Sequence, residues 1–309
     1  MKRQILFVHL AVVALVISVA VPGSAQQFVW IANSEALNLA PGAVSLWGQW
    51  ACTDCEFNAT YQFTANQFHQ ISTPTQFATI SVGGGSVMQF DEVWATDFNG
   101  NIFQWNNYTQ AFQQVSGSLQ NVVVGEGYTS CHPYEVWGTN SSNEVFRYNY
   151  CSFGWDPISG FFSGLATGGG EIWALNGYDQ IFRYDFATNQ FDLMPGQLTQ
   201  ISVGAGGVWG TYTGNNSVWQ FNPSTKNWEQ LPGSMSDISA GSDGVFGSYV
   251  DPYSGQNSIY RLDPSTRTWT LIYNNSGGWD GIDCLRVGTG AGTWMSQGIG
   301  GNTYYYLSF

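Results

Sequence analysis

The chain has 309 residues, of which 21 are acidic and eight are Lys or Arg, so its formal net charge at pH 7 is −13. Only 9% of the residues are charged, whereas 16% are aromatic and 38 are glycine, a composition typical of many short strands joined by tight turns. So few cations argue against nucleic acid and against anionic membrane surfaces as partners.

Residues 1–25 have the pattern of a secretory signal peptide. Lys2 and Arg3 precede a largely apolar run from Ile5 to Val21, and small residues lead to Ala25, after which we expect cleavage. An uncleaved membrane anchor is the alternative, because the run is close to the shortest length that spans a bilayer. Cleavage would change the net charge from −13 to about −15. We therefore expect residues 26–309 to be secreted, or periplasmic in a bacterium, without membrane insertion of the mature chain.

After the signal peptide, one pattern of four short strands recurs along the chain. Its third strand is the most regular, with an aliphatic, an aromatic, a polar, a bulky apolar and a turn residue in order. Copies of this strand occur at 60–64, 102–106, 145–149, 181–185, 218–222, 259–263 and 304–308. The fourth strand carries an aromatic and then an aliphatic residue three positions later, as at Trp228 and Leu231. A repeat of about 40 residues with four strands is typical of a propeller blade.

Two further strands precede the third one in each repeat. The first consists of small residues and ends in glycine, as in Ile201–Gly204, which fits strands that crowd around a central axis. The second is centred on a large aromatic residue: Trp47, Trp94, Trp137, Trp173, Trp209, Phe246 and Trp294. The sequence thus predicts an all-β fold, a single seven-bladed β-propeller of four-stranded antiparallel blades over residues 26–309.

The last repeat, at 285–309, ends after its third strand. The missing fourth strand is found at the other end of the mature chain, where Phe28–Ile31 has the expected aromatic and aliphatic spacing. We expect this N-terminal strand to pair with the C-terminal one, because closing the last blade in this way leaves no exposed strand edge.

The segments Ile201–Gly210, Val218–Phe221 and Trp228–Gly233 together resemble the tectonin repeat of tachylectin-1-like and fish-egg lectins. The likeness extends over essentially the whole mature chain. It implies a propeller that binds glycans, including bacterial lipopolysaccharide or modified sugars, without catalysis. That family is usually described with six blades, so six blades is the alternative to seven.

Kelch repeats are a second alternative. Residues 184–191 and 263–269 look like the third and fourth strands of a kelch blade, but the kelch double glycine after a hydrophobic second strand is absent.

The five cysteines suggest disulfides in an exported chain. We expect Cys131 to pair with Cys151 inside one repeat and Cys52 to pair with Cys55, which leaves Cys284 free. Zinc binding at Cys52 and Cys55 is the alternative, although no second CxxC pair or nearby histidine pair completes such a site.

Catalytic and cofactor motifs are absent. Beyond the signal peptide the only histidines are His69 and His132, which we expect to be surface or packing residues. No nucleophile elbow, zinc-protease, Walker or EF-hand spacing occurs, so we expect no enzyme activity, cofactor or metal.

One position varies from repeat to repeat while the packing positions stay constant. It lies three residues beyond the second-strand aromatic, where the strand should run into a turn on one rim of the ring. Its residue types suit stacking on sugars or hydrogen bonding to hydroxyls. We therefore expect ligand-binding residues at Trp50, Asp97, Asn140, Asn176, Tyr212, Tyr249 and Gln297. Further residues on the same rim are Asn99, Tyr178, Asn215, Asp251 and Tyr253, and unconstrained variation of polar turns is the competing interpretation.

The sequence therefore favours a secreted, lectin-like protein that recognises a carbohydrate or glycoconjugate. A scaffold or adhesion propeller that binds a protein partner through the same rim is the alternative. An enzyme with an unrecognised site is a third hypothesis, against which the scarcity of His and Lys argues.

Overall fold

The structure is a computed structural model, and it describes residues 27–35, 38–41, 45–50, 59–64, 67–83, 91–204, 206–241, 244–251, 253, 257–274, 285–290, 292–297 and 302–307. In these ranges every regular element is a β-strand. The predicted signal peptide lies outside the described residues. The described part of the chain contains no apolar helix of membrane-spanning length.

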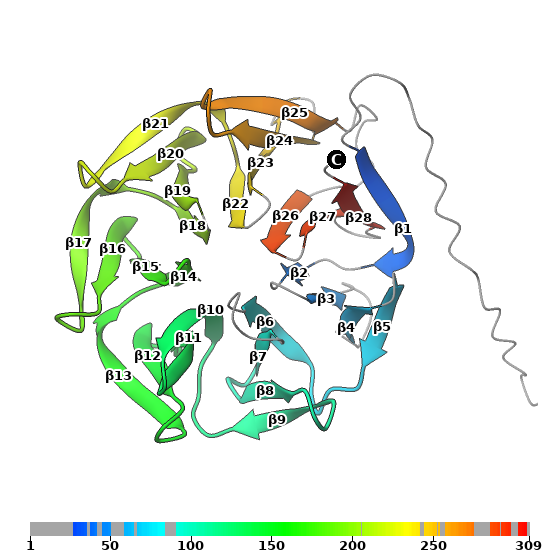
Figure 1. The fold of residues 1–309 in the computed structure, drawn as a ribbon, viewed down its shortest axis with the longest axis vertical. Helices are drawn as coiled ribbons and strands as arrows, with labels where there is room; N and C mark the ends of the chain where they lie inside the picture. The colour runs from blue at the N-terminus through cyan, green and yellow to red at the C-terminus, as the bar shows by residue number, and fades with distance from the viewer. Residues whose placement is uncertain are drawn as a thin grey trace, which may run out of the picture.

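The described strands form seven four-stranded antiparallel sheets, arranged around a common centre as the blades of a β-propeller (Figure 1). Blade 1 consists of β2 (Asn38–Pro41), β3 (Leu46–Trp50), β4 (Ala59–Thr64) and β5 (Gln67–Ile71). Blade 2 consists of β6 (Phe77–Gly83), β7 (Glu92–Asp97), β8 (Ile102–Asn106) and β9 (Ala111–Val115). Blade 3 consists of β10 (Asn121–Thr129), β11 (His132–Thr139), β12 (Glu144–Asn149) and β13 (Gly154–Phe161).

The second half of the chain continues the pattern. Blade 4 consists of β14 (Gly164–Gly168), β15 (Glu171–Leu175), β16 (Gln180–Asp185) and β17 (Gln190–Gln197). Blade 5 consists of β18 (Gln200–Gly204), β19 (Gly207–Tyr212), β20 (Ser217–Asn222) and β21 (Asn227–Ser234). Blade 6 consists of β22 (Asp237–Gly241), β23 (Gly244–Val250), β24 (Asn257–Asp263) and β25 (Thr268–Asn274).

The last blade joins the two ends of the chain. It contains β26 (Leu285–Gly290), β27 (Gly292–Gln297) and β28 (Asn302–Leu307), and its fourth strand is β1 (Gln27–Glu35). β1 pairs antiparallel with β28, with Gln27 opposite Leu307 and Trp30 opposite Tyr304. The predicted closure by the N-terminal strand is confirmed, so β28 presents no free edge where β1 pairs with it.

The second-strand aromatics form the packing layer between blades. Trp47, Trp94, Trp137 and Trp173 are fully buried. Each contacts aromatic rings of the next blade edge to face; Trp137, for example, lies with its ring centroid 4.6 Å from that of Tyr184. Such pairs add to the free energy gained by burying their apolar area, and their repetition around the ring holds neighbouring blades together.

The first strands lie nearest the centre of the ring (Figure 1). Their backbones approach one another closely: a Cβ atom on Gly204 would lie 2.7 Å from the carbonyl carbon of Ala240 in the next blade. Side chains also hydrogen-bond across the gap, since Ser202 Oγ accepts the N–H of Ala240 at 2.8 Å. The predicted reason for glycine at this position, close backbone approach, is confirmed at Gly204.

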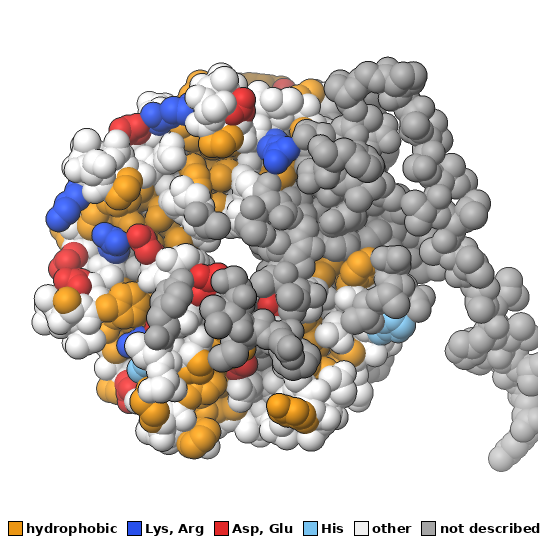
Figure 2. Space-filling view, viewed as in Figure 1, with side chains coloured by type: hydrophobic (Ala, Val, Ile, Leu, Met, Phe, Trp, Pro, Cys, Tyr) orange, Lys and Arg blue, Asp and Glu red, His pale blue; other side chains and the backbone are white. Residues whose placement is uncertain are grey.

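The shared strand order of the sheets gives the ring two different faces. Turns between second and third strands, together with the connections between blades, lie on one side, which we call the 2–3 face. Turns between first and second strands and between third and fourth strands lie on the other, which we call the 1–2 face. Figure 2 shows an opening at the centre of the ring, with acidic side chains reaching toward it.

One disulfide is present among the described residues. It joins Cys131 in the turn between β10 and β11 to Cys151 in the turn between β12 and β13, as predicted. Cys52, Cys55 and Cys284 lie outside the described residues.

Candidate binding face

Asp97, the predicted rim residue of blade 2, organises the turn between β7 and β8. Its carboxylate accepts the backbone N–H of Asn99 at 2.9 Å and that of Asn101 at 2.8 Å. It also accepts the Asn101 side-chain amide at 2.7 Å. Asp97 is buried by these contacts. Side chains of Asp and Asn commonly bond to backbone two residues ahead and so set a turn.

The equivalent residues of blades 3 and 4 do the same. Asn140 Oδ1 accepts the N–H of Ser142 at 2.9 Å and of Glu144 at 3.0 Å. Asn176 Oδ1 accepts the N–H of Tyr178 at 3.0 Å and of Gln180 at 3.0 Å. Three of the predicted ligand-binding residues are therefore anchors of their own turns, and whether they also contact a ligand stays a prediction.

In two more turns of the same face, the Asx side chain lies two or three residues after the predicted ligand-binding residue of that blade. Asp251 Oδ1 accepts the N–H of Tyr253 at 2.8 Å, and Asn215 Oδ1 accepts the N–H of Ser217 at 3.1 Å. Both Asp251 and Asn215 belong to the predicted rim. Side-chain hydrogen bonds thus order the 2–3 turn in each of blades 2 to 6.

These ordered turns present large exposed rings. Phe98, Tyr178 and Tyr253, in three different blades, are 66%, 79% and 94% exposed. Phe161 at the end of β13 is also exposed, and it lies opposite Glu144 in the strand register. Exposed aromatic side chains on backbone held by hydrogen bonds provide flat surfaces that lose little freedom when a ligand stacks on them.

The other predicted residues lie elsewhere or cannot be placed. Tyr212 on β19 and Tyr249 on β23 are half-buried and pack against hydrophobic clusters of the blades. Trp50 and Gln297 end strands β3 and β27, and their side chains lie outside the described part of the structure. The structure therefore brings the Asx side chains to equivalent places on the 2–3 face, while the two tyrosines contribute to packing.

A second polar cluster, which the sequence analysis missed, lies toward the 1–2 face. In blades 2 to 4 a glutamate precedes the second-strand tryptophan by two residues and accepts its indole N–H. The three pairs are Glu92 with Trp94, Glu135 with Trp137 and Glu171 with Trp173. In blades 3 and 4 an arginine from the third strand, Arg147 or Arg183, forms an ion pair with the glutamate.

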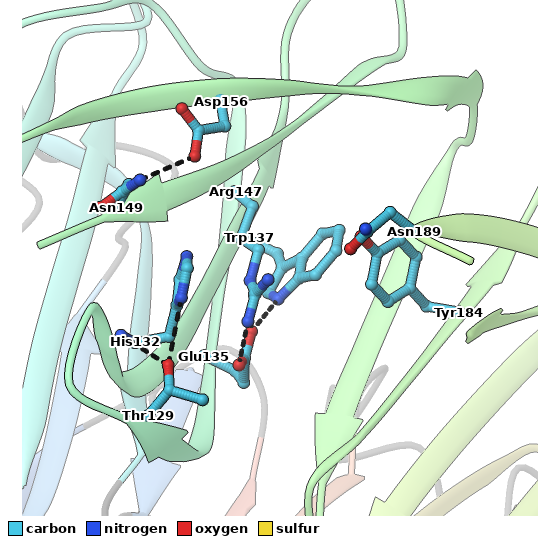
Figure 3. A network of polar contacts seen from close by, with 9 residues as sticks. All are labelled: Thr129, His132, Glu135, Trp137, Arg147, Asn149, Asp156, Tyr184 and Asn189. Carbon is cyan, nitrogen blue, oxygen red and sulfur yellow. Dashed lines mark hydrogen bonds and ion pairs between the residues drawn. The ribbon is translucent and has the colours of Figure 1, made fainter. Parts of the chain in front are cut away.

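In blade 3 this cluster consists of Glu135, Trp137 and Arg147 (Figure 3), and its ion pair is more buried than that of blade 4. Arg147 donates from Nε at 2.8 Å and from Nη2 at 2.5 Å to the two oxygens of Glu135. Its guanidinium carbon lies 5.5 Å from the centroid of the Trp137 ring and 5.2 Å from that of Phe186 in the next blade. Because Arg147 bonds both oxygens of Glu135 and lies over one ring of blade 3 and one of blade 4, this cluster helps to hold the two blades together.

Blade 2 has glutamine where blades 3 and 4 have arginine. Glu92 accepts hydrogen bonds from Gln104 at 2.5 Å, from Trp94 at 2.7 Å and from the Tyr150 hydroxyl of blade 3 at 2.8 Å. Burial raises the pKa of the Glu92 carboxyl above its usual value, against the lowering effect of these three donors. Burial, with Glu92 nearby, also raises the pKa of Tyr150, so its hydroxyl stays a donor.

His132 lies beside this region, next to the disulfide. Its Nδ1 is 3.3 Å from Thr129 Oγ1, whose oxygen also accepts the His132 backbone N–H at 3.1 Å (Figure 3). Burial and the nearby Arg147 lower the pKa of His132. Among the described residues no group of three or more His, Cys, Asp and Glu side chains could hold a metal ion.

Sequence signals for the missed cluster exist. Glutamate stands two residues before tryptophan in three repeats, and arginine or glutamine occupies the middle of the third strand. Blade 5 has Gly207 instead of glutamate, and there the Trp209 indole nitrogen is buried with no hydrogen-bond partner among the described residues. The glutamate therefore serves to satisfy a buried indole N–H.

Comparison with known proteins agrees with this geometry. Residues 162–303, which include blades 4 to 6, match the Tectonin domain. Over these residues the chain is a tectonin-repeat β-propeller. No curated protein sequence matches it.

Solved structures share the fold of this β-propeller at low sequence identity. Human WBSCR16 is 10% identical, with a TM-score of 0.61 over 90% of this chain and 88% of that one. YCF48, solved bound to the D1 peptide, is 11% identical, with a TM-score of 0.59 over 94% of this chain and 99% of that one. At such identities these likenesses establish the architecture alone.

Proposed function

We propose that this tectonin-repeat propeller is a secreted, lectin-like protein that binds glycans through its 2–3 face and catalyses no reaction. The observation that carries the proposal is the set of exposed rings, Phe98, Tyr178 and Tyr253, on turns ordered by side-chain hydrogen bonds. Aromatic rings pack against the C–H faces of sugars, and neighbouring amides and hydroxyls bond to sugar hydroxyls.

Repetition suits a polymeric ligand. Each turn offers one ring and a few polar groups, so a single contact would be weak. A saccharide chain or a glycan-coated surface that engages several blades gains avidity because the later contacts are intramolecular. Cell-surface sugars and bacterial lipopolysaccharide are ligands of this kind.

The test is a glycan array and a lipopolysaccharide pull-down with the purified protein, followed by titration of any ligand found. We expect Tyr178→Ala and Tyr253→Ala, singly and together, to weaken binding, the pair by roughly tenfold or more. Tyr108→Ala and Phe153→Ala are matched controls, since these rings are as exposed but lie in turns of the 1–2 face. Equal losses in the controls, or no saccharide bound at millimolar concentration, would contradict the proposal.

A protein partner is the second candidate. YCF48, which shares the fold, was solved bound to a peptide, and exposed aromatic residues are also typical of protein interfaces. Cross-linking the protein in the culture medium of its source, with Tyr178→Ala as the comparison, would identify such a partner if glycans do not bind.

A further inference from the structure

The two faces of the ring differ in their charges. The basic side chains that the structure describes all belong to third strands or to the turns that follow them: Arg147, Arg183, Lys226, Arg261 and Arg267. In the described ranges, no Lys or Arg lies in a turn of the 2–3 face or in a connection between blades.

Most of these cations are already engaged. Arg147 and Arg183 pair with Glu135 and Glu171. Arg267 donates to Glu229 of the preceding blade at 2.6 Å. These arginines are therefore bound to carboxylates within the blades or toward the 1–2 face, and not placed to contact a ligand on the 2–3 face.

The exposed rings of the 2–3 face stand instead beside carboxylates. Asp179 follows Tyr178 directly, and it is partly exposed. Glu144 is exposed and lies opposite Phe161 in the strand register. Asp251 Oδ1 accepts the backbone N–H of Tyr253 at 2.8 Å, so carboxylate and ring belong to the same turn. Ring and carboxylate thus recur together in three blades.

The charge of a sugar should therefore affect how tightly it binds to these rings. Two like charges repel, and they do so more strongly beside protein than in bulk water. An acidic group on a sugar stacked on these rings would meet this repulsion, and no Lys or Arg side chain that the structure describes lies on the 2–3 face to offset it. An ammonium group would instead be attracted by both the carboxylate and the ring face.

We propose that the 2–3 face is selective for glycans without acidic groups, and that it binds amine-bearing sugars more tightly than uronic or sulfated ones of the same length. This inference rests on the proposed glycan-binding function and narrows its ligand class: within lipopolysaccharide, only stretches of the saccharide chain without acidic groups would qualify. Neutral sugars fall between the two, because they stack without gain or loss from charge.

The test compares oligosaccharides of equal length in low salt: glucosamine oligomers, N-acetylglucosamine oligomers and galacturonic acid oligomers. We expect affinity to fall in that order, with roughly fivefold or more between the first and the last. The spread should shrink as salt rises, because the charges are screened. Asp179→Asn and Glu144→Gln should each lower affinity for the glucosamine oligomer. Asp192→Asn, which removes an exposed charge from the outer strand β17, is the matched control.

The outcomes separate this inference from the function on which it rests. Binding of no saccharide of any charge removes both. Binding of the galacturonic acid oligomer as tightly as the glucosamine oligomer, with loss on Tyr178→Ala, overturns the charge selectivity and leaves the lectin function intact. Equal effects of Asp192→Asn and Asp179→Asn would likewise overturn it, since overall charge and not the 2–3 face would then be responsible.

Discussion

The side-chain oxygen of Asn176 accepts the backbone N–H of Tyr178 at 3.0 Å, so an Asx residue and an exposed ring form one unit on the 2–3 face. The same oxygen accepts the N–H of Gln180, which closes the turn on its other side. The backbone that carries the ring is thereby ordered before a ligand arrives, so less conformational freedom is lost on binding.

Asn176→Ala should therefore weaken saccharide binding without removing the ring. Each lost hydrogen bond costs about 0.5–1.5 kcal/mol of unfolding free energy, so we expect a loss of about 1–3 kcal/mol in all. Asn176→Asp should restore both properties, since Asp97 performs the same task in blade 2. Thermal unfolding and ligand titration of the three proteins measure this. A stable Asn176→Asp variant that fails to bind would instead assign the Asn176 amide a direct ligand contact.

Glu92 should make stability depend on pH. Its pKa is raised in the folded protein, so the folded state holds the proton more tightly than the unfolded chain does. The stabilising effect of this protonation is complete below the ordinary pKa near 4.5 and is lost as pH rises through the higher folded pKa. Each unit of elevation corresponds to about 1.4 kcal/mol.

Glu92→Gln removes the titrating group and keeps an acceptor oxygen. We expect the variant to gain in unfolding free energy relative to the parent as pH rises from 4 to 8, measured by denaturant unfolding at each pH. Glu144→Gln, an exposed glutamate, is the control and should change little. A difference between Glu92→Gln and parent that stays constant over this range would contradict the assignment.

The fold could be predicted because its determinants repeat. The pattern of third and fourth strands, the buried second-strand aromatics such as Trp137 and the closure of β28 by β1 all follow from spacing and residue type. Packing positions can be recognised in the sequence because each blade needs a residue of the same kind at the same place.

The site could be predicted only in part, because spacing does not reveal whether a polar side chain bonds to its own turn or is free to contact a ligand. Asn140 and Asn176 stand on the expected rim, yet their oxygens bond the backbone two and four residues ahead. The Glu135–Arg147 pair was missed because it joins two strands whose polar residues seem unremarkable when each is read alone. Exposure of Phe98 and Phe161 depends on how the turns and blade ends fold, which no single-strand pattern specifies.

Crowding at the centre of the ring predicts a contrast between two glycines of first strands. Gly204→Ala would place a Cβ 2.7 Å from the Ala240 carbonyl carbon and 2.8 Å from its oxygen, which are backbone atoms and cannot rotate away. Gly164→Ala meets no atom within 4 Å. We expect Gly204→Ala to cost about 1–3 kcal/mol of unfolding free energy and Gly164→Ala to be nearly neutral. Similar denaturation midpoints for the two variants would show that the inner strands are not in close contact.

Removing the disulfide between Cys131 and Cys151 should destabilise the protein where the bridge joins two turns of the 1–2 face. Cys131 and Cys151 are 20 residues apart, and a bridge over a loop of that size stabilises a folded protein by about 3 kcal/mol, chiefly by restricting the unfolded chain. It also joins the two turns of blade 3 beside Tyr150, whose backbone N–H donates to the Cys131 carbonyl at 3.0 Å. Replacing both cysteines by serine should lower the melting temperature by roughly 6–12 °C.

The matched control for this prediction is the reductant itself. Reductant should lower the melting temperature of the parent toward that of the Cys131→Ser, Cys151→Ser double variant, and any further fall seen in the variant would report other disulfides. Because the Tyr150 hydroxyl donates to Glu92 across the boundary between blades 2 and 3 and lowers the Glu92 pKa, loosening Tyr150 in the double variant should raise that pKa further and increase the pH dependence assigned to Glu92. A variant that melts with the parent under oxidising conditions would show that backbone pairing alone holds these turns.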